Sequence, residues 1–163
     1  MRSPTISSWD ASPADPGVVA LDDYQVSDSP EALALERECV QGAGLRLSFH
    51  RETVHRRAEG FAVHRLVTAR ADGKLVGVVA VAVKPALLRG RPTHVAFGFD
   101  LRVHPTWRGR GLGRRLFERA AGWGLERADL AYTYNVAGNQ AARALASSLG
   151  TEAAGYAYLV YPA

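Results

Sequence analysis

The segment 101–123 constrains the fold more than any other part of this chain, because its apolar periodicity changes halfway along. Residues 101–103 continue a strand-like alternation, and Pro105 then ends it because proline lacks a backbone donor. From Leu112 onward the apolar residues recur at helical spacing. Three glycines separate the two patterns: Gly109, Gly111 and Gly113. The segment therefore predicts a strand, a tight loop and a helix in direct succession.

The glycine loop has the properties of an anion-binding site. Glycine adopts positive φ readily, so successive amides can converge on one point, and the first amides of a helix have no partner in the helix itself. Arginines suited to bidentate phosphate contacts surround the loop: Arg108, Arg110, Arg114 and Arg115. A Walker loop is excluded because GxxxxGK is absent, and a dinucleotide fingerprint is excluded because Arg114 replaces its last glycine. The loop predicts binding of the pyrophosphate of a nucleotide cofactor.

Charge is concentrated in the same segment. The whole chain has a net charge of +4, yet residues 101–120 alone hold six arginines against Glu118. Such a patch suits a polyphosphate cofactor, and it would also attract RNA. The aromatic interleaving typical of single-strand binders is missing here, so nucleic acid is the less favoured partner. For Arg115 and Arg119 a solvated helix face is the simpler interpretation.

The loop resembles motif A of the GCN5-related N-acetyltransferases (GNAT), which bind acetyl-CoA there. The pattern Arg/Gln-x-x-Gly-x-Gly/Ala is satisfied by Arg108, Gly111 and Gly113 after the VHP break. A weaker resemblance, carried by LRVHPTWRGRGLG and a closing LVYP, links the chain to plant Hookless-type N-acetyltransferases. The GNAT resemblance extends roughly over residues 60–161.

A second motif of the same family lies further along. The pattern Asn-x-x-Ala-x-x-Leu followed by Gly is matched by Asn139, Ala142, Leu145 and Gly150. Two positions depart from the family. Ala146 stands where the family usually has a Tyr near the CoA sulfur that often serves as general acid, and Thr151 stands where it has Phe. The resemblance therefore supports cofactor binding better than it supports chemistry.

The pattern of elements predicts an α/β (α+β) fold of one main domain. Residues 1–16 form a flexible lead-in and 17–163 a single GNAT domain. The resemblance implies a mixed, mostly antiparallel sheet with a V-shaped splay between strands 4 and 5, flanked by about four helices. The expected elements, in order, are helices at 28–40 and 49–58, strands at 63–71, 74–84 and 93–103, a helix at 112–123, a strand at 130–136, a helix at 140–149 and a strand at 155–161.

The Asp72-Gly73 pair predicts a tight hairpin, whereas residues 85–92 are expected to form a longer loop. That loop either helps to shape the substrate pocket or is the exposed tip of a plain hairpin. The strand at 155–161 is expected to leave an unpaired edge, because the chain stops before the family's usual last strand. Either a partner subunit completes this edge in a homodimer, an N-terminal segment covers it, or the chain is a fragment of something longer.

Composition adds exclusions. With 47% apolar residues and no apolar run near the roughly 18 residues of a membrane span, we expect no membrane contact. No signal peptide is evident, so the expected location is cytoplasmic. Cys39 is the only cysteine, which excludes a thiolate metal cage, and we expect no metal.

The resemblance implies which residues hold acetyl-CoA. The backbone of Leu101, Arg102 and Val103 would pair with the pantetheine arm, and the motif A loop would hold the pyrophosphate. The cofactor-binding residues of the loop and of the second motif are Arg108, Gly109, Arg110, Gly111, Leu112, Gly113, Arg114 and Asn139.

The chemistry implied is N-acetylation of a primary amine on a small molecule or protein. Asp100 beside the cofactor strand is the candidate proton acceptor, and Tyr134 is the candidate acid in place of Ala146. Tyr132 is its alternative, and both tyrosines could instead be sheet aromatics. His94 and His104 are weaker candidates. The alternative function is an acyl-CoA-binding module with little or no turnover.

Overall fold

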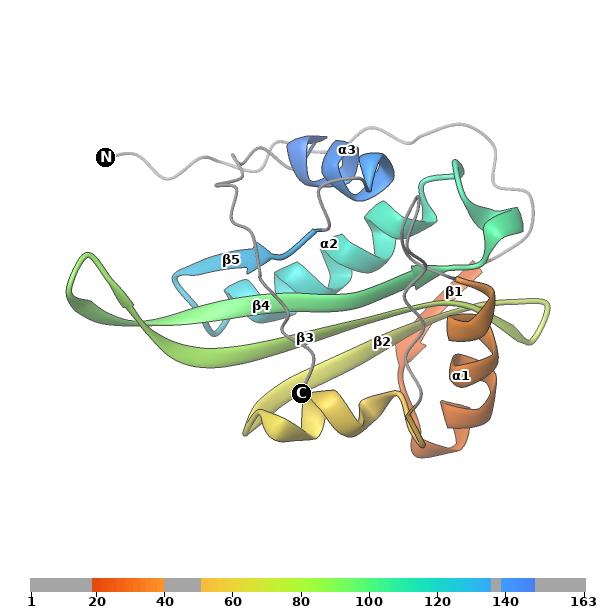
Figure 1. Cartoon of the computed structure of the whole chain (residues 1–163), viewed down its shortest axis with the longest axis horizontal. Coiled ribbons are helices and arrows are strands. Elements are labelled where there is room, and N and C mark those ends of the chain that lie inside the picture. The colour runs from red at the N-terminus through yellow and green to blue at the C-terminus, as the bar shows by residue number, and fades with distance from the viewer. Residues whose placement is uncertain (1–18, 40–50, 136–138, 149–163) are drawn as a thin grey trace, which may run out of the picture.

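A five-stranded sheet forms the centre of the computed structural model, which describes residues 19–39, 51–135 and 139–148. The strands lie in chain order across the sheet (Figure 1). The first four are antiparallel to their neighbours, and the last pair is parallel. The strands are β1 (Val19–Asp23), β2 (Val63–Ala71), β3 (Lys74–Leu88), β4 (Arg91–Val103) and β5 (Leu130–Thr133).

Helices cover both faces of this sheet (Figure 1). Helix α2 (Leu112–Leu125) packs on one face, and α1 (Ser29–Glu38) with the 3-10 helix η2 (His55–Gly60) packs on the other. Helix α3 (Gln140–Ser148) lies near the end of β5, and two short 3-10 turns are η1 (Val26–Asp28) and η3 (Pro105–Trp107).

The two apolar clusters of the core correspond to the two faces of the sheet. Alternate residues of β3 point to opposite faces, so Val79 packs under α2 whereas Val78 packs under α1. Since both faces are covered, the strand reads as a continuous apolar run rather than an alternating one. Leu116 of α2 and Ala32 of α1 are completely buried against these faces.

Strands β4 and β5 separate after a short pairing. They pair only from Val95 with Leu130 to Gly98 with Thr133, after which β4 continues to Val103 paired with β3 but not with β5. The V-shaped splay expected between strands 4 and 5 is thereby confirmed. At the point of divergence β4 also carries a bulge against β3, where Asp100 adopts a left-handed backbone with φ of 53°.

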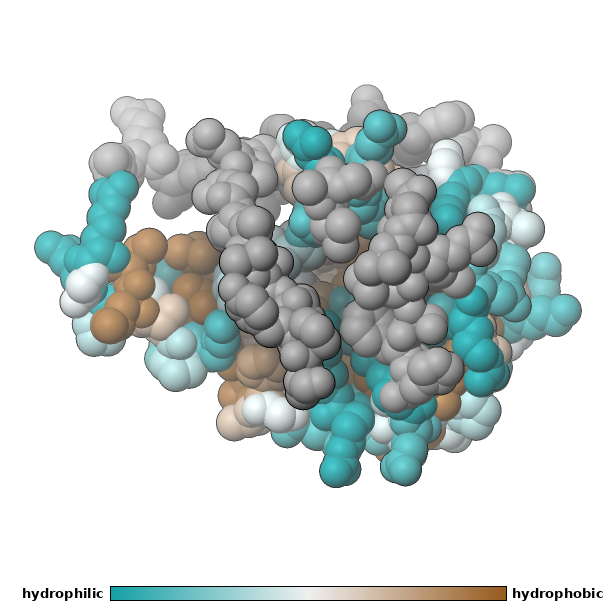
Figure 2. Space-filling model, in the orientation of Figure 1, coloured by the Kyte–Doolittle hydropathy of each residue, from teal (hydrophilic) through white to brown (hydrophobic). Residues whose placement is uncertain are grey.

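The expected loop at 85–92 is wrong, because β3 and β4 stay paired to Leu88 and Arg91. Arg89 and Gly90 both have positive φ, 50° and 77°, which is the geometry of a tight two-residue hairpin turn. The resulting arm projects beyond the sheet, and Figure 2 shows apolar surface along it, where Leu87 is 73% exposed. Proline is tolerated in the arm because neither strand has a second neighbour there.

Three other expectations differ from the structure. Strand β1 was not expected, because only one of its five residues is buried. The expected second helix is the 3-10 helix η2, shifted toward the C-terminus, and its expected start at 49–50 lies outside the described residues. The lead-in at 1–16 and the strand at 155–161 also lie outside them.

Two glycines of α2 permit a matched test of its packing. A Cβ at Gly124 would lie 2.6 Å from the Cβ of Ala96, whereas a Cβ at Gly122 would meet nothing within 4 Å. We expect Gly124→Ala to lower the free energy of unfolding by about 1–3 kcal/mol through overpacking. Gly122→Ala should raise it by about 0.5–1 kcal/mol through helix propensity. Urea denaturation measures both, and equal effects would contradict the close approach of α2 to β4.

Candidate active site

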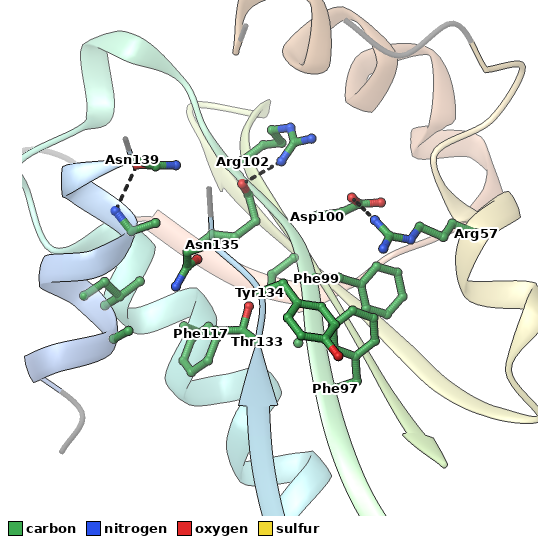
Figure 3. Close-up of a pocket in the computed structure, with 16 residues that line it drawn as sticks. Arg57, Phe97, Phe99, Asp100, Arg102, Phe117, Thr133, Tyr134, Asn135 and Asn139 are labelled. Carbon is green, nitrogen blue, oxygen red and sulfur yellow. Dashed lines mark hydrogen bonds and ion pairs between the residues drawn. The ribbon is translucent and has the colours of Figure 1, made fainter. Parts of the chain in front are cut away.

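A cavity of about 170 Å³ lies where β4 and β5 diverge (Figure 3). Its walls come from β3, β4, β5 and the segment after it, α2, α3 and η2. The arm at 85–92 contributes no lining residue, so of its two interpretations the hairpin with an exposed tip is the one that the structure favours. The residues that line the cavity are Arg57, Val79, Phe97, Gly98, Phe99, Asp100, Leu101, Arg102, Phe117, Thr133, Tyr134, Asn135, Asn139, Ala142, Leu145 and Ala146.

The end of β4 presents backbone groups toward the opening. The His104 amide donates to the Val76 carbonyl at 2.9 Å, and backbone directions alternate along a strand. The amides of Val103 and Leu101 therefore face away from β3, on the side where β5 is no longer paired. The two carbonyls accept side-chain donors, Leu101 from Arg102 and Val103 from Arg108, each at 3.1 Å.

The glycine loop leads directly into α2. Gly109 and Gly111 have φ of 73° and 75°, and a Cβ at either would meet nothing within 4 Å. Gly111 is the N-cap of α2, so the first amides of the helix, including those of Leu112 and Gly113, have no carbonyl one turn earlier to bind. A Cβ at Gly113 would lie 3.6 Å from Val103 Cγ2, which places the loop beside the end of β4.

The arginines around this loop have defined positions. The Arg110 guanidinium stacks over Trp107 at 5.2 Å, and Arg114 donates to Glu118 at 2.7 Å. Arg115 donates to the Val19 carbonyl of β1, so it joins the helix to the sheet rather than remaining only solvated. Arg102 is different, because its side chain is buried and lies 3.6 Å from Glu36. The role expected of Arg102, pairing with the pantetheine arm, therefore falls to its backbone alone.

Asp100 lines the cavity but is already paired. Its two carboxylate oxygens accept from Arg51 at 2.8 Å and Arg57 at 3.1 Å, and its side chain is 7% exposed. Arg51 also donates twice to Glu36, at 2.6 and 2.8 Å. Burial lowers the pKa of Arg51, but its hydrogen bonds to Glu36 and Asp100 outweigh burial and raise that pKa above its ordinary value. The network fixes the bulge of β4.

Tyr134 lines the cavity and is, with Thr133, one of two residues with a side-chain hydroxyl among the described lining residues. It is 48% exposed and its ring contacts Phe97 at 5.5 Å and Tyr132 at 5.3 Å. Ala146 lines the same cavity from α3, so the position where the family usually has a Tyr does face this space. Tyr132 does not line it.

The remaining candidates have structural partners. His104 lies 2.7 Å from Glu38 and also contacts Thr106, and neither it nor His94 lines the cavity. Asn139 lines it, but its side-chain oxygen accepts from the Ala142 amide at 3.0 Å and caps α3. Burial raises the pKa of the Cys39 thiol, which donates to the Val103 carbonyl. Among the described residues, no group of three or more His, Cys, Asp or Glu could hold a metal ion.

The sequence matches the model of the Acetyltransferase (GNAT) family over residues 21–151. The chain belongs to the GNAT acetyltransferase family. No curated protein matches the sequence significantly. The GNAT fold and the acetyltransferase class are thereby established for this chain. None of the described helices is long and apolar enough to cross a membrane.

Solved GNAT-like structures share the fold at low identity. A transcriptional regulator from Bacillus halodurans C-125 superposes with a TM-score of 0.71 at 20% identity, covering 88% of this chain and 99% of that one. A Trypanosoma brucei acetyltransferase superposes with a TM-score of 0.68 at 18% identity, covering 89% of this chain and 100% of that one. AAC(6')-Iy was solved with the bisubstrate analogue CoA-S-monomethyl-acetylneamine. It superposes with a TM-score of 0.67 at 17% identity, covering 90% of this chain and 99% of that one.

Sequence reasoning missed the arginines and aromatic side chains that shape this cavity. Arg57 lies on η2 and reaches Asp100 across 43 positions of the chain. Phe97 and Phe99 flank Gly98, where a Cβ would lie 3.2 Å from the Phe117 ring. The Phe-Gly-Phe alternation before Asp100 was the one available signal, because it places two aromatic side chains on one face of the strand.

Proposed function

We propose that this chain transfers an acetyl group from acetyl-CoA to a primary amine. The observation that carries the proposal is the continuity between cavity and loop. Leu101 lines the cavity, Val103 ends the same strand, and Gly113 of the loop lies against Val103. One path along the splayed edge of β4 therefore joins a space for the reacting groups to a loop suited to a pyrophosphate.

The residues present fit acetyl-CoA. The open space at Gly109 and Gly111 lets phosphate oxygens approach the backbone, and the first amides of α2 supply donors with a partial positive charge. The Arg110 guanidinium lies on Trp107 beside that loop and can add a full charge. The outward-facing amides of Leu101 and Val103 are available to an extended pantetheine chain in place of a fifth strand.

The thioester supplies an activated carbonyl for the reaction. The amine nitrogen attacks this carbonyl carbon, a C–N bond forms and the C–S bond breaks. The amine proton passes to a base or to water, and the thiolate takes up a proton. We assign stabilisation of the charge on the carbonyl oxygen to a backbone amide of β4 near the bulge at Asp100.

Tyr134 is the side chain that we assign to protonating the thiolate. It supports this role because its ring stands at the cavity and is half exposed, whereas Ala146 offers no hydroxyl. Asp100 can accept the amine proton only through competition with the two guanidiniums that hold it. Its pairing favours a role in positioning the bulge, so Asp100→Asn should disturb β4 as well as proton transfer.

A binding module without turnover is the second candidate function, and Ala146 in the cavity wall favours it. An RNA-binding role for the arginine loop is less favoured, since Arg108 and Arg114 already have protein partners.

Calorimetric titration with acetyl-CoA tests the cofactor half of the proposal. We expect micromolar binding that weakens with salt and is unaffected by a single-stranded RNA competitor. If RNA binds in a salt-sensitive way and acetyl-CoA does not compete with it, the loop serves nucleic acid instead.

A further inference from the structure

Five aromatic side chains form a connected cluster beside the cavity, and we call them the aromatic cluster; three of them, Phe97, Phe99 and Tyr134, line the cavity itself. Phe97 stacks on Phe99 at 5.0 Å and on Tyr132 at 5.1 Å. Tyr134 and Phe61 each contact the Phe97 ring, at 5.5 and 6.2 Å between ring centres. Figure 3 shows Phe97, Phe99 and Tyr134 close together beside the cavity. On this side of the cavity a ligand meets the rings of Phe97, Phe99 and Tyr134.

Two cations lie on the aromatic cluster. The Arg57 guanidinium is 4.9 Å from the Phe99 ring centre, and the Lys84 Nζ is 5.7 Å from that of Phe97 and 5.5 Å from that of Tyr132. Arg57 is paired with Asp100. Lys84 makes no ion pair with a carboxylate of the described residues. A hydrogen bond to Tyr132 raises the pKa of Lys84 above its ordinary value, so the ammonium stays charged.

Negative charge is scarce around the same space. Asp100 is the only carboxylate among the described residues that line the cavity, and its oxygens are held by Arg51 and Arg57. The ion-pair network that includes Asp100 contains three guanidiniums and two carboxylates. Arg51 and Arg57 bind Asp100, and Arg51 and Arg102 both lie beside Glu36. In the sequence outside the described ranges, residues 40–50 and 136–138 carry no acid, 149–163 carry one, Glu152, and 1–18 carry two, Asp10 and Asp15. A polycationic amine would find little to neutralise it.

We infer that the acceptor is a small amine that joins an apolar or aromatic body to a carboxylate, of the kind found in an aromatic amino acid. The aromatic cluster receives the body, Lys84 binds the carboxylate, and the amine reaches the cavity beside Tyr134. The inference rests on the proposed function and specifies its acceptor. It excludes spermidine-like polycations, because the site is cationic where such amines need carboxylates.

A matched pair of amines tests this acceptor class. Phenylalanine and phenethylamine differ only by the carboxylate, and spermidine represents polycations. We expect wild type to acetylate phenylalanine with kcat/KM about tenfold above phenethylamine, since a hydrogen bond to a charged group is lost without the carboxylate. Lys84→Gln should lower kcat/KM for phenylalanine about tenfold, to the level of phenethylamine. Lys74→Gln replaces the only other lysine, exposed at the β2–β3 turn, and should change neither.

Other results would overturn the inference. They are a preference for spermidine, an equal effect of Lys84→Gln on both matched amines, and acetylation of peptide N-termini alone. Lys84→Glu serves as a second variant and should favour phenethylamine over phenylalanine. Titration of the same samples with acetyl-CoA distinguishes failure of the acceptor class from failure of the proposed acetyl transfer. Binding with turnover of the wrong amine leaves the proposed function standing, whereas binding without turnover of any amine removes both.

Discussion

Gly111→Val is expected to weaken acetyl-CoA binding at least about 100-fold, the largest effect in this account. Gly111 has φ of 75° and open space at the position of a Cβ. A branched side chain there is strained, and it also occupies the space through which phosphate oxygens would reach the first amides of α2. Calorimetric titration of the variant against wild type measures the loss.

Gly73→Val is the matched control for this substitution. Gly73 has φ of 76° and equally open surroundings, but it lies in the turn between β2 and β3. Both variants should therefore lose similar stability from backbone strain, whereas only Gly111→Val should lose binding. Equal binding by the two variants would mean that the loop does not hold the cofactor.

Tyr134→Phe is expected to lower kcat about 100-fold while leaving KM for acetyl-CoA unchanged. A positioned general acid contributes about 100- to 10,000-fold to the rate. We expect the lower value here because a thiolate is a good leaving group. The ring contacts of Tyr134 with Phe97 and Tyr132 survive in the variant, so the fold should not change. Steady-state kinetics with a thiol reagent measures both parameters.

Tyr24→Phe is the control for loss of a hydroxyl. Tyr24 Oη lies 3.0 Å from the His55 Nδ1 and does not line the cavity, so kcat should stay at the wild-type level. An unchanged kcat in Tyr134→Phe would remove Tyr134 from the mechanism. A raised KM with unchanged kcat would assign it to binding instead.

Much of the fold could be predicted because local patterns decide it. Strand β2 was predicted with its correct bounds, since Asp72-Gly73 marks the turn at its end and its β-branched residues favour a strand. Helix α2 and the glycine loop before it were predicted because the change of periodicity at residues 101–123 is visible in the sequence alone.

The arm of β3 and β4 could not be read in the same way. Pro85 and Pro92 suggested a loop, but proline is excluded only where a strand needs its donor, and the arm has open edges. The Arg89-Gly90 turn was the overlooked signal, because Gly supplies one of the two positive φ values that a tight hairpin needs.

The site was predictable only in part. Motif A and the splay follow from a contiguous stretch of chain, whereas the partners of Asp100 do not. Arg51 meets it across 49 positions, and their pairing depends on how η2 and α1 pack on β4. The roles of the residues predicted to bind acetyl-CoA stay predictions until a complex or a titration tests them.

The most direct test of acetyl transfer is the stoichiometry of a single reaction mixture. Wild-type protein, acetyl-CoA and phenylalanine are combined, and the released CoA thiol and the acetylated amine are quantified together. The account predicts amine-dependent release, with one acetylated amine formed for each CoA. Firm binding of acetyl-CoA with no CoA release for phenylalanine or any other amine would contradict it, and would identify the chain as a binding module.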